Sequence, residues 1–374
     1  MPYPSHDDYL EAIRTPRACF KDALLRAGVV ESGEDGCPIG AGGTFAVVFR
    51  LTCGAESYAV KCFTREVAER AARYEELSAY LRAHPAPCFT TFEYIRQGIL
   101  VNGDWYPIVR MPWVEAPRLD AYLDECLRRE AGLSPLLEEI IQLERLLRRH
   151  HIGHGDLQHG NLLVEADSGR IVLVDYDGMY VPPLAGRLPE EDGHPNYQHP
   201  QRIQQGHYAE EVDRFSLLTL YLSVRALESD PSLWLEFHGA DNLLFTSHDF
   251  LLPGATRLWE RLQDSPGPNV RALARDLIHC CRGPLDAVPT LTELLGGMRQ
   301  GTKAAPARDR RNVTRALLKR SPAWLVDALA INPADYFAGE WNARRYLFFF
   351  GVLFLITGII ATGVMVLLYT VWGQ

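Results

Sequence analysis

The sequence has no excess of basic residues, no cysteine framework and no apolar segment behind its first methionine. Its net charge of −9 argues against general nucleic-acid binding. The eight cysteines include no CxxC pair, so we expect reduced thiols in a cytoplasmic domain rather than disulfides or a zinc site. A cleavable signal peptide is not expected, and no internal repeat is present. What remains is an ordinary globular composition in 374 residues, enough for a two-lobed domain with appendages.

The charge is distributed unevenly along the chain. Residues 303–320 carry seven Lys or Arg against one Asp, whereas the first 302 residues sum to about −14. The segment Tyr346–Trp372 contains no charged residue, and a helix of that length spans roughly 40 Å, enough to cross a membrane. Arg344 and Arg345 precede it, which places the N-terminal region in the cytoplasm by the positive-inside rule. We therefore predict a transmembrane helix over 346–372 behind a basic juxtamembrane linker over 301–345, which can also contact anionic lipids.

Upstream of the linker, apolar patterns predict a strand-rich part followed by a helix-rich part. The expected strands are Glu56–Phe63, Phe92–Val101 and Trp105–Met111, the last two joined by an Asn102-Gly103 turn. The expected helices are Val67–Arg82, Leu119–Arg129 and Ser134–His151, the last with Ser134 as its cap and Pro135 in its first turn. The fold class that follows is α+β and bilobal, with a β-rich N-lobe, a helical C-lobe and one C-terminal transmembrane helix. The expected boundaries are an N-terminal helical extension over 1–34, an N-lobe over 35–111 and a hinge with C-lobe over 112–300.

Two segments of the C-lobe combine polar residues with apolar runs. They read GHGDLQHGNLLV over 153–164 and IVLVDYDG over 171–178. Asp156 lies five positions before Asn161, and Asp175 follows an apolar strand pattern. Two Asp and one Asn can surround the triphosphate of a nucleotide and its Mg²⁺, with one Asp left to receive a hydroxyl proton. This arrangement suits phosphoryl transfer from ATP.

The N-lobe contains a loop of small residues at 39–49, with the sequence IGAGGTFAVVF. Small residues let backbone N–H groups approach phosphates that a Cβ atom would obstruct. A strand pattern follows the loop where a dinucleotide-binding fold would have a helix. Two alignments of this loop with a glycine-rich phosphate loop remain open. One uses Gly40 and Gly42 and has Phe45 where a third Gly is usual. The other uses Ala41, Gly43 and Ala46.

Together these segments resemble the catalytic core of the protein kinase superfamily, and among its members an atypical bacterial eukaryotic-like Ser/Thr protein kinase. The resemblance runs from about residue 38 to 298 and is specific over 153–217. It implies that Asp156 accepts the proton of the substrate hydroxyl and that Asn161 and Asp175 bind Mg²⁺. His154 would orient the catalytic loop.

In the N-lobe the resemblance implies an ATP site. Lys61, thirteen residues past Val48, would contact the phosphates and pair with a Glu of the following helix. Glu75 is the first choice for that partner, with Glu76 and Glu69 still open. The segment YPIVRMPWV over 106–114 resembles the hinge between the lobes. The remaining nucleotide contacts that this implies are Val48 beside the loop, Met111 at the back of the adenine pocket and the backbone of 112–115, including Trp113.

Later segments of the C-lobe extend the resemblance. Residues 193–201 (GHPNYQHPQ) resemble the GTPxYxAPE segment that closes the kinase activation region, and residues 289–295 resemble the RPTxxELL end of the C-lobe. Residues 211–217 (EVDRFSL) resemble the VDxWSxG helix start. In that motif the Asp, here Asp213, binds the backbone of the catalytic loop; an ordinary helix N-cap is the alternative.

The sequence also departs from the kinase pattern. Gly155 replaces the Arg of HRD, and residues 179–199 contain no Ser or Thr, so a switch based on Ser/Thr phosphorylation of this loop is not expected. The kinase pattern has an ion pair between the Glu of APE and the Arg before Pro-Thr, and here both members are replaced, by Gln201 and Val288, so no unpaired charge is left. The other replacements are Asp177 for the Gly of DFG, Gln158 for the catalytic-loop Lys and His194 for the Thr of the P+1 segment.

Three functions remain open at this stage. The leading hypothesis is an active protein kinase that uses ATP and Mg²⁺, tethered to the cytoplasmic face of a membrane. The pattern HGDLxxGN also occurs in aminoglycoside- and choline-kinase-type enzymes, which favours a small-molecule kinase as the second hypothesis. Asp177 and the loosely matching glycine loop favour the third, a membrane-anchored pseudokinase scaffold.

Overall fold

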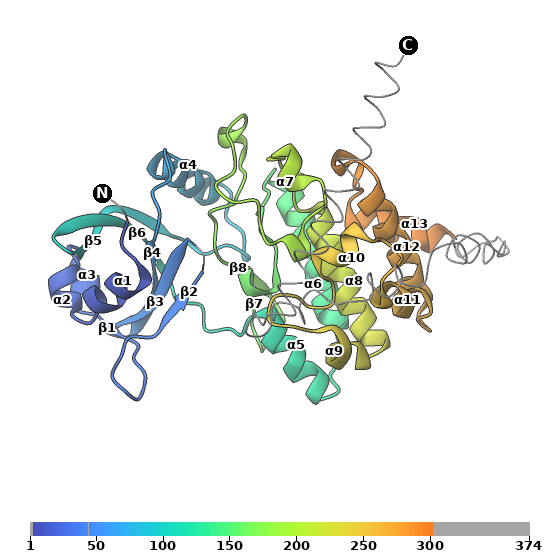
Figure 1. Ribbon diagram of the computed structural model, residues 1–374, viewed down its shortest axis with the longest axis horizontal. Helices are drawn as coiled ribbons and strands as arrows, with labels where there is room; N and C mark the ends of the chain where they lie inside the picture. The colour runs from blue at the N-terminus through green and yellow to red at the C-terminus, as the bar shows by residue number, and fades with distance from the viewer. Residues whose placement is uncertain (1–2, 44, 302–374) are drawn as a thin grey trace, which may run out of the picture. The chain divides into compact units, whose positions relative to one another are not determined.

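An antiparallel β-sheet forms the N-terminal lobe of the computed structural model, which describes residues 3–43 and 45–301 (Figure 1). The strand order is β1-β3-β4-β6-β5, and β2 pairs with β3. The strands are β1 (Val29–Val30), β2 (Gly40–Gly42), β3 (Ala46–Cys53), β4 (Glu56–Phe63), β5 (Glu93–Val101) and β6 (Asp104–Pro112). The three predicted strands are confirmed, and Asn102 and Gly103 form the β5–β6 turn with φ values of 51° and 93°.

Three short helices cover one face of this sheet. They are α1 (His6–Ile13), α2 (Pro16–Cys19) and α3 (Ala23–Arg26). Tyr9 and Ile13 lie four residues apart on α1, so both side chains point into the same apolar cluster as Phe49 and Leu51 of β3. The hydroxyl of Tyr9 also donates to the carbonyl of Phe63 at 2.6 Å. The N-terminal segment thus packs as part of the lobe, and its β1 pairs with β3.

Helix α4 (Arg70–Ala83) fulfils the helix predicted over Val67–Arg82 but begins three residues later. The residue before it, Glu69, has a left-handed backbone with φ 61°, which delays the first turn. Tyr74, Leu77 and Leu81 recur at helical spacing and are buried in the large apolar cluster that continues into the C-lobe. One face of α4 is therefore fixed by the packing between the lobes.

Helices dominate the C-terminal lobe (Figure 1). They are α5 (Leu119–Arg128), α6 (Ser134–Arg149), α7 (Arg202–Gln205), α8 (Arg214–Ser229), α9 (Ser232–Phe237), α10 (Ser247–Leu251), α11 (Arg257–Gln263), α12 (Pro268–Arg282) and α13 (Leu291–Gly301). Helix α8 is buried along most of its length, in keeping with an apolar sequence on all sides. A two-stranded ribbon, β7 (Leu162–Val164) and β8 (Ile171–Leu173), lies in the part of this lobe nearest the sheet.

Helices α5 and α6 match their predicted ranges closely, with one correction at the start of α6. Ser134 was expected to cap this helix, but the N-cap is Leu133 and no side chain bonds to the first turn. The Ser134 hydroxyl instead donates to Glu228 at 2.6 Å. Pro135 occupies the first turn as expected, where its missing N–H costs no helix hydrogen bond.

The membrane predictions fall almost entirely outside the described part of the chain. Gly301 ends α13, and the rest of the linker over 301–345 and the span over 346–372 lie beyond it. Between residues 3 and 301, leaving out residue 44, no helix combines the length and apolarity needed to cross a bilayer.

Candidate active site

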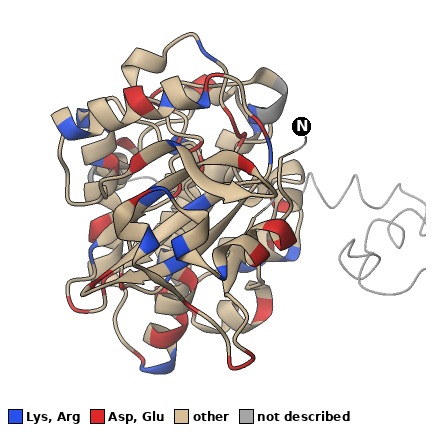
Figure 2. Cartoon of the chain, turned by 90° about the vertical axis from the view of Figure 1, so that its left-hand side faces the viewer, with Lys and Arg blue, Asp and Glu red and all other residues tan. Residues whose placement is uncertain are grey.

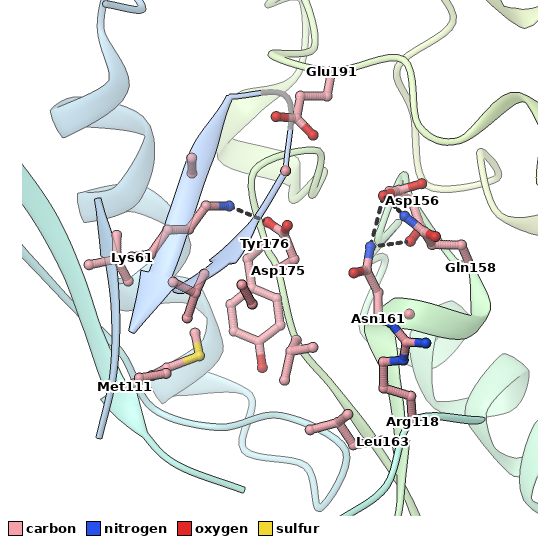
Figure 3. A pocket seen from close by; sticks show the side chains of 18 of the residues that line it. Lys61, Met111, Arg118, Asp156, Gln158, Asn161, Leu163, Asp175, Tyr176 and Glu191 are labelled. Atoms are coloured by element: carbon pink, nitrogen blue, oxygen red, sulfur yellow. Dashed lines mark hydrogen bonds and ion pairs between the residues drawn. The ribbon is translucent and has the colours of Figure 1, made fainter. Parts of the chain in front are cut away.

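A cavity of about 780 Å³ lies between the sheet and the C-lobe (Figure 3). Both lobes contribute polar groups to it, and most of the residues predicted from the sequence line it. These are Gly42, Gly43, Ala46, Val48, Lys61, Met111, Trp113, Asp156, Asn161 and Asp175. Two predicted residues, Gly40 and Glu75, do not line it.

The carboxylate of Asp156 is held from three sides. Its Oδ1 accepts the backbone N–H of His194 at 2.6 Å, and its Oδ2 accepts the side-chain amide groups of Asn161 at 2.8 Å and Gln158 at 3.1 Å. Asn161 also donates to the Asp156 carbonyl at 3.0 Å. Among residues 3–43 and 45–301, the donors that reach this carboxylate are all amide groups, so Gln158 and the backbone of His194 orient it without adding a positive charge.

The loop that carries Asp156 is fixed by a residue at the start of α8. Asp213 accepts the backbone N–H groups of His154 and, at 2.9 Å, Gly155. Asp213 occupies the N-cap position of α8 but makes no side-chain bond to that helix, so the expected contact with the loop of Asp156 is confirmed and the capping bond is not formed. The imidazole of His154 is within 3.1 Å of the Val174 carbonyl, which joins the catalytic loop to the strand before Asp175.

Gly155 lies where backbone segments approach closely. Its φ is +82°, and a Cβ atom there would lie 2.2 Å from the carbonyl oxygen of Gly178. The guanidinium group of Arg202, at the start of α7, lies beside it and donates to the Gly155 carbonyl at 2.5 Å. A side chain at position 155 would clash with the backbone of Gly178, so the packing disfavours an Arg there, and Arg202 brings a cation to the loop from another element.

Lys61 reaches two carboxylates across the cavity. Its ammonium group donates to Asp175 Oδ1 at 2.5 Å and to Asp177 Oδ2 at 2.8 Å. Burial by itself lowers the pKa of Lys61, but the two negative charges outweigh it and raise this pKa above its ordinary value. The ammonium group therefore stays charged at neutral pH, as a contact to phosphates requires.

The expected ion pair between Lys61 and a glutamate of the following helix is not present. Glu75 is 62% exposed and pairs with Arg96 at 2.6 Å. Glu69 lies 3.7 Å from Arg187. The reason is helical geometry, since successive residues are 100° apart and the residue of α4 that lines the cavity is Tyr74, one position before Glu75. The assignment of Glu75 to the nucleotide site is thereby corrected.

Asp175 has a left-handed backbone, with φ 65°. This conformation is uncommon outside glycine and clusters at functional sites. The next residue anchors it: the Tyr176 ring is buried, its hydroxyl donates to the Leu173 carbonyl at 2.8 Å and accepts the N–H of Thr90 at 2.9 Å. The Asp175 carboxylate is directed into the cavity and remains 38% exposed.

Asn161 and Asp175 fit the requirements of a Mg²⁺ site. Asn161 donates through its amide nitrogen to Asp156, which leaves its amide oxygen on the side of Asp175 (Figure 3). Mg²⁺ prefers oxygen ligands and usually takes only one or two from protein side chains, with phosphates and water completing its shell. An amide oxygen and a carboxylate that face one cavity are ligands that such a Mg²⁺ site could use.

The segment after Gly178 contains two adjacent glutamates, of which only the second lines the cavity. Glu190 is buried and lies 3.3 Å from Arg70 and 3.6 Å from Arg73 of α4. Glu191 lines the cavity. Burial, followed by the charges of Asp175 and Asp177, raises the pKa of Glu191 to about 8. At neutral pH this carboxyl group is therefore largely protonated and adds little negative charge beside Asp175.

At the opposite end, the sheet and the predicted hinge form the apolar part of the cavity. Met111 and Val48 lie on its walls, and the N–H of Trp113 pairs with the carbonyl of Ser57 at 2.8 Å. Gly40 has a packing role instead: a Cβ atom there would meet Val47 at 2.8 Å and the Phe49 ring at 2.9 Å. Of the two alignments of the loop, the one on Ala41, Gly43 and Ala46 has all of its members in the lining.

Sequence reasoning missed three residues of this region: Tyr74, Glu190 and Arg202. Each acts on a residue far away in the chain, and a single sequence carries no signal for such pairs. Asp177 was noted in the sequence as an acidic residue where the kinase pattern has Gly, but its contact with Lys61 is seen only in the structure.

No protein-family model and no curated protein sequence matches the chain. Among solved structures, the chain is similar to the kinase PK-1 of Cydia pomonella granulovirus, with a TM-score of 0.50 and 14% sequence identity. The similarity covers 72% of this chain and 93% of that chain. At this identity the likeness establishes the fold, which is protein-kinase-like.

Proposed function

We propose that the chain is a phosphotransferase that moves the γ-phosphoryl group of ATP to a protein hydroxyl. The observation that carries the proposal is that Lys61, Asp156, Asn161 and Asp175 line one cavity between two lobes of a protein-kinase-like fold. Mg²⁺, when bound, neutralises charge on the phosphates as the bond to the leaving group breaks. Lys61 contributes a second positive charge on the N-lobe side.

Asp156 has the role of proton acceptor in this proposal. The substrate hydroxyl attacks the γ-phosphorus, the bond from that phosphorus to the ADP oxygen breaks, and the hydroxyl proton passes to the Asp156 carboxylate. Asn161 and Gln158 hold Asp156 Oδ2, so the carboxylate keeps one orientation during proton transfer. Correct placement, more than covalent chemistry, is what a kinase site supplies.

The proposal is tested with the full-length protein and labelled Mg-ATP. Transfer of phosphate to a protein, or autophosphorylation, is expected in the wild type. Asp156→Ala and Asp175→Ala are expected to lower it by roughly a hundredfold or more. Equal activity in the wild type and both variants would contradict the proposal.

The fate of the label and a thermal-shift measurement distinguish two other functions. A small-molecule kinase is favoured by Gln158, which takes the place of the Lys that serves Ser/Thr acceptors, and it would place the label in metabolites and never in protein. A pseudokinase scaffold is favoured by the direct contact of Lys61 with Asp175, and it would give no thermal shift with Mg-ATP.

Membrane tethering is part of the proposal and rests on the sequence alone. The uncharged segment 346–372 would anchor the chain, and the basic linker before it would lie against anionic headgroups on the cytoplasmic side. Acceptor proteins would then be those that reach the same membrane surface.

A further inference from the structure

Asp177 is a buried carboxylate, and both of its oxygens are engaged. Oδ2 accepts from the Lys61 ammonium at 2.8 Å, and Oδ1 accepts the hydroxyl of Tyr74 on α4. Resting on the proposed phosphotransferase function, we propose that Asp177 is the positioning residue that holds Lys61, in the place that the sequence pattern assigns to a glutamate of α4. The negative partner of Lys61 then belongs to the same loop as Asp175.

The two carboxylates that contact Lys61 have different surroundings. The Asp175 side chain is 38% exposed and faces the cavity, whereas that of Asp177 is 2% exposed. Asp175 is therefore free to turn to a cation or to water. Asp177 would lose two hydrogen bonds and remain buried if it turned, which is costly for a charged group. Lys61 thus keeps a fixed partner even when Asp175 is drawn to another ligand.

Helix α4 contributes a neutral donor to this arrangement. Tyr74 is buried, and burial followed by the charges of Asp177 and Asp175 raises its pKa well above the ordinary value. The phenol therefore remains protonated and can donate to Asp177. Because Glu75 lies on the outer face with Arg96, the connection of α4 to Lys61 runs through Tyr74 and Asp177.

The test compares Asp177→Asn, Tyr74→Phe and Glu75→Gln in the full-length protein, with Mg-ATP affinity measured by calorimetry. Asp177→Asn is expected to weaken binding by about tenfold or more, because a buried charge loses its fixed partner. Tyr74→Phe is expected to weaken it by roughly threefold to tenfold. Glu75→Gln is the matched control on the same helix and should stay within about twofold of the wild type.

A double-mutant cycle separates positioning of Lys61 from general damage. In a Lys61→Met background, Asp177→Asn is expected to have no further effect on Mg-ATP affinity, because the group that it positions is gone. A loss of the same size in both backgrounds would overturn the proposal.

Labelling of Lys61 by an amine-acylating reagent, followed by mass spectrometry, gives a readout that needs no nucleotide. The labelling rate should rise in Asp177→Asn and Tyr74→Phe and stay unchanged in Glu75→Gln. If the wild type binds no Mg-ATP, the proposed function fails, and the labelling rates alone decide this proposal. Unchanged labelling in a folded Asp177→Asn protein overturns it; if that variant does not fold, unchanged labelling in Tyr74→Phe does so.

Discussion

Single residues decide how closely the loop of Asp156 and the segment 179–199 can pack. Gly155 and Gly193 both have positive φ, and a Cβ atom on Gly193 would lie 2.5 Å from the Gly155 carbonyl oxygen. The two glycines thus let two loops touch through their backbones. The glycine at position 155 and the close packing of the two backbones are therefore two aspects of one feature.

This contact predicts that Gly155→Ala destabilises the fold. Gly186→Ala is the matched control, since its φ of +80° is similar and a Cβ there would meet nothing within 4 Å. We expect the control to lose about 1 kcal/mol and Gly155→Ala roughly 2–4 kcal/mol, because the clash adds to the backbone strain. Urea unfolding measures both. Equal losses would show that the close contact with Gly178 does not matter.

Glu191 gives a prediction for pH dependence. Its pKa is about 8 in the folded protein, against an ordinary value of 4.5 in the unfolded chain. Between these values the folded state binds more protons than the unfolded state, so this group makes stability fall as the pH rises. Glu191→Gln keeps the neutral form at every pH. We therefore expect the variant to gain stability relative to the wild type from pH 5 to pH 9, as measured by urea unfolding without Mg²⁺. Parallel pH curves would contradict the raised pKa.

At the scale of elements, ion pairs connect the segment 179–199 to α4. Glu190 contacts Arg70 and Arg73, and all three side chains are almost fully buried. These contacts tie the segment 179–199, which has no Ser or Thr, to α4.

The contact of Glu190 with Arg70 and Arg73 predicts that Glu190→Gln loosens the segment 179–199. Removing the charge leaves two buried arginines without their anion, which costs about 3 kcal/mol. Hydrogen exchange is expected to quicken over 179–199 and in the first turns of α4. Glu69→Gln serves as the control, because Glu69 is 75% exposed and an exposed pair contributes little. If both variants exchange like the wild type, Glu190 does not hold the segment.

At the scale of the whole molecule, charge and hydropathy divide the chain. Acidic and basic residues are interspersed along the elements seen in Figure 2, whereas the sequence gathers basic residues at 303–320 and apolar ones at 346–372. The described residues all belong to the compact unit that ends at Lys303. We therefore expect nucleotide binding and membrane association to be separable.

A protein truncated after Lys303 tests this separation. We expect it to keep the stabilisation by Mg-ATP of the full chain, about 2.7 kcal/mol at a ligand concentration a hundred times Kd. We expect the full chain in the membrane fraction and the truncated protein in the soluble fraction. The control is a chain that lacks only 346–372. A truncated protein that still sediments with membranes would contradict the predicted anchor.

The sequence by itself determined the order of the elements and the identity of the groups along the cavity. Strand β4, the β5–β6 turn and helices α5 and α6 follow from local periodicity and turn chemistry, which act over a few residues. Asp156, Asn161 and Asp175 could be expected to share one cavity because they lie within twenty residues of one another in the chain.

The tertiary structure decided which groups meet. A one-residue step on α4 turned Glu75 outward and Tyr74 inward, and sequence periodicity does not resolve a rotation of that size. Packing of α4 on the C-lobe then set Tyr74 against Asp177 and gave Lys61 a partner more than a hundred residues away. Contacts of this kind depend on how two lobes fit together, which is a property of the whole fold and not of any one segment.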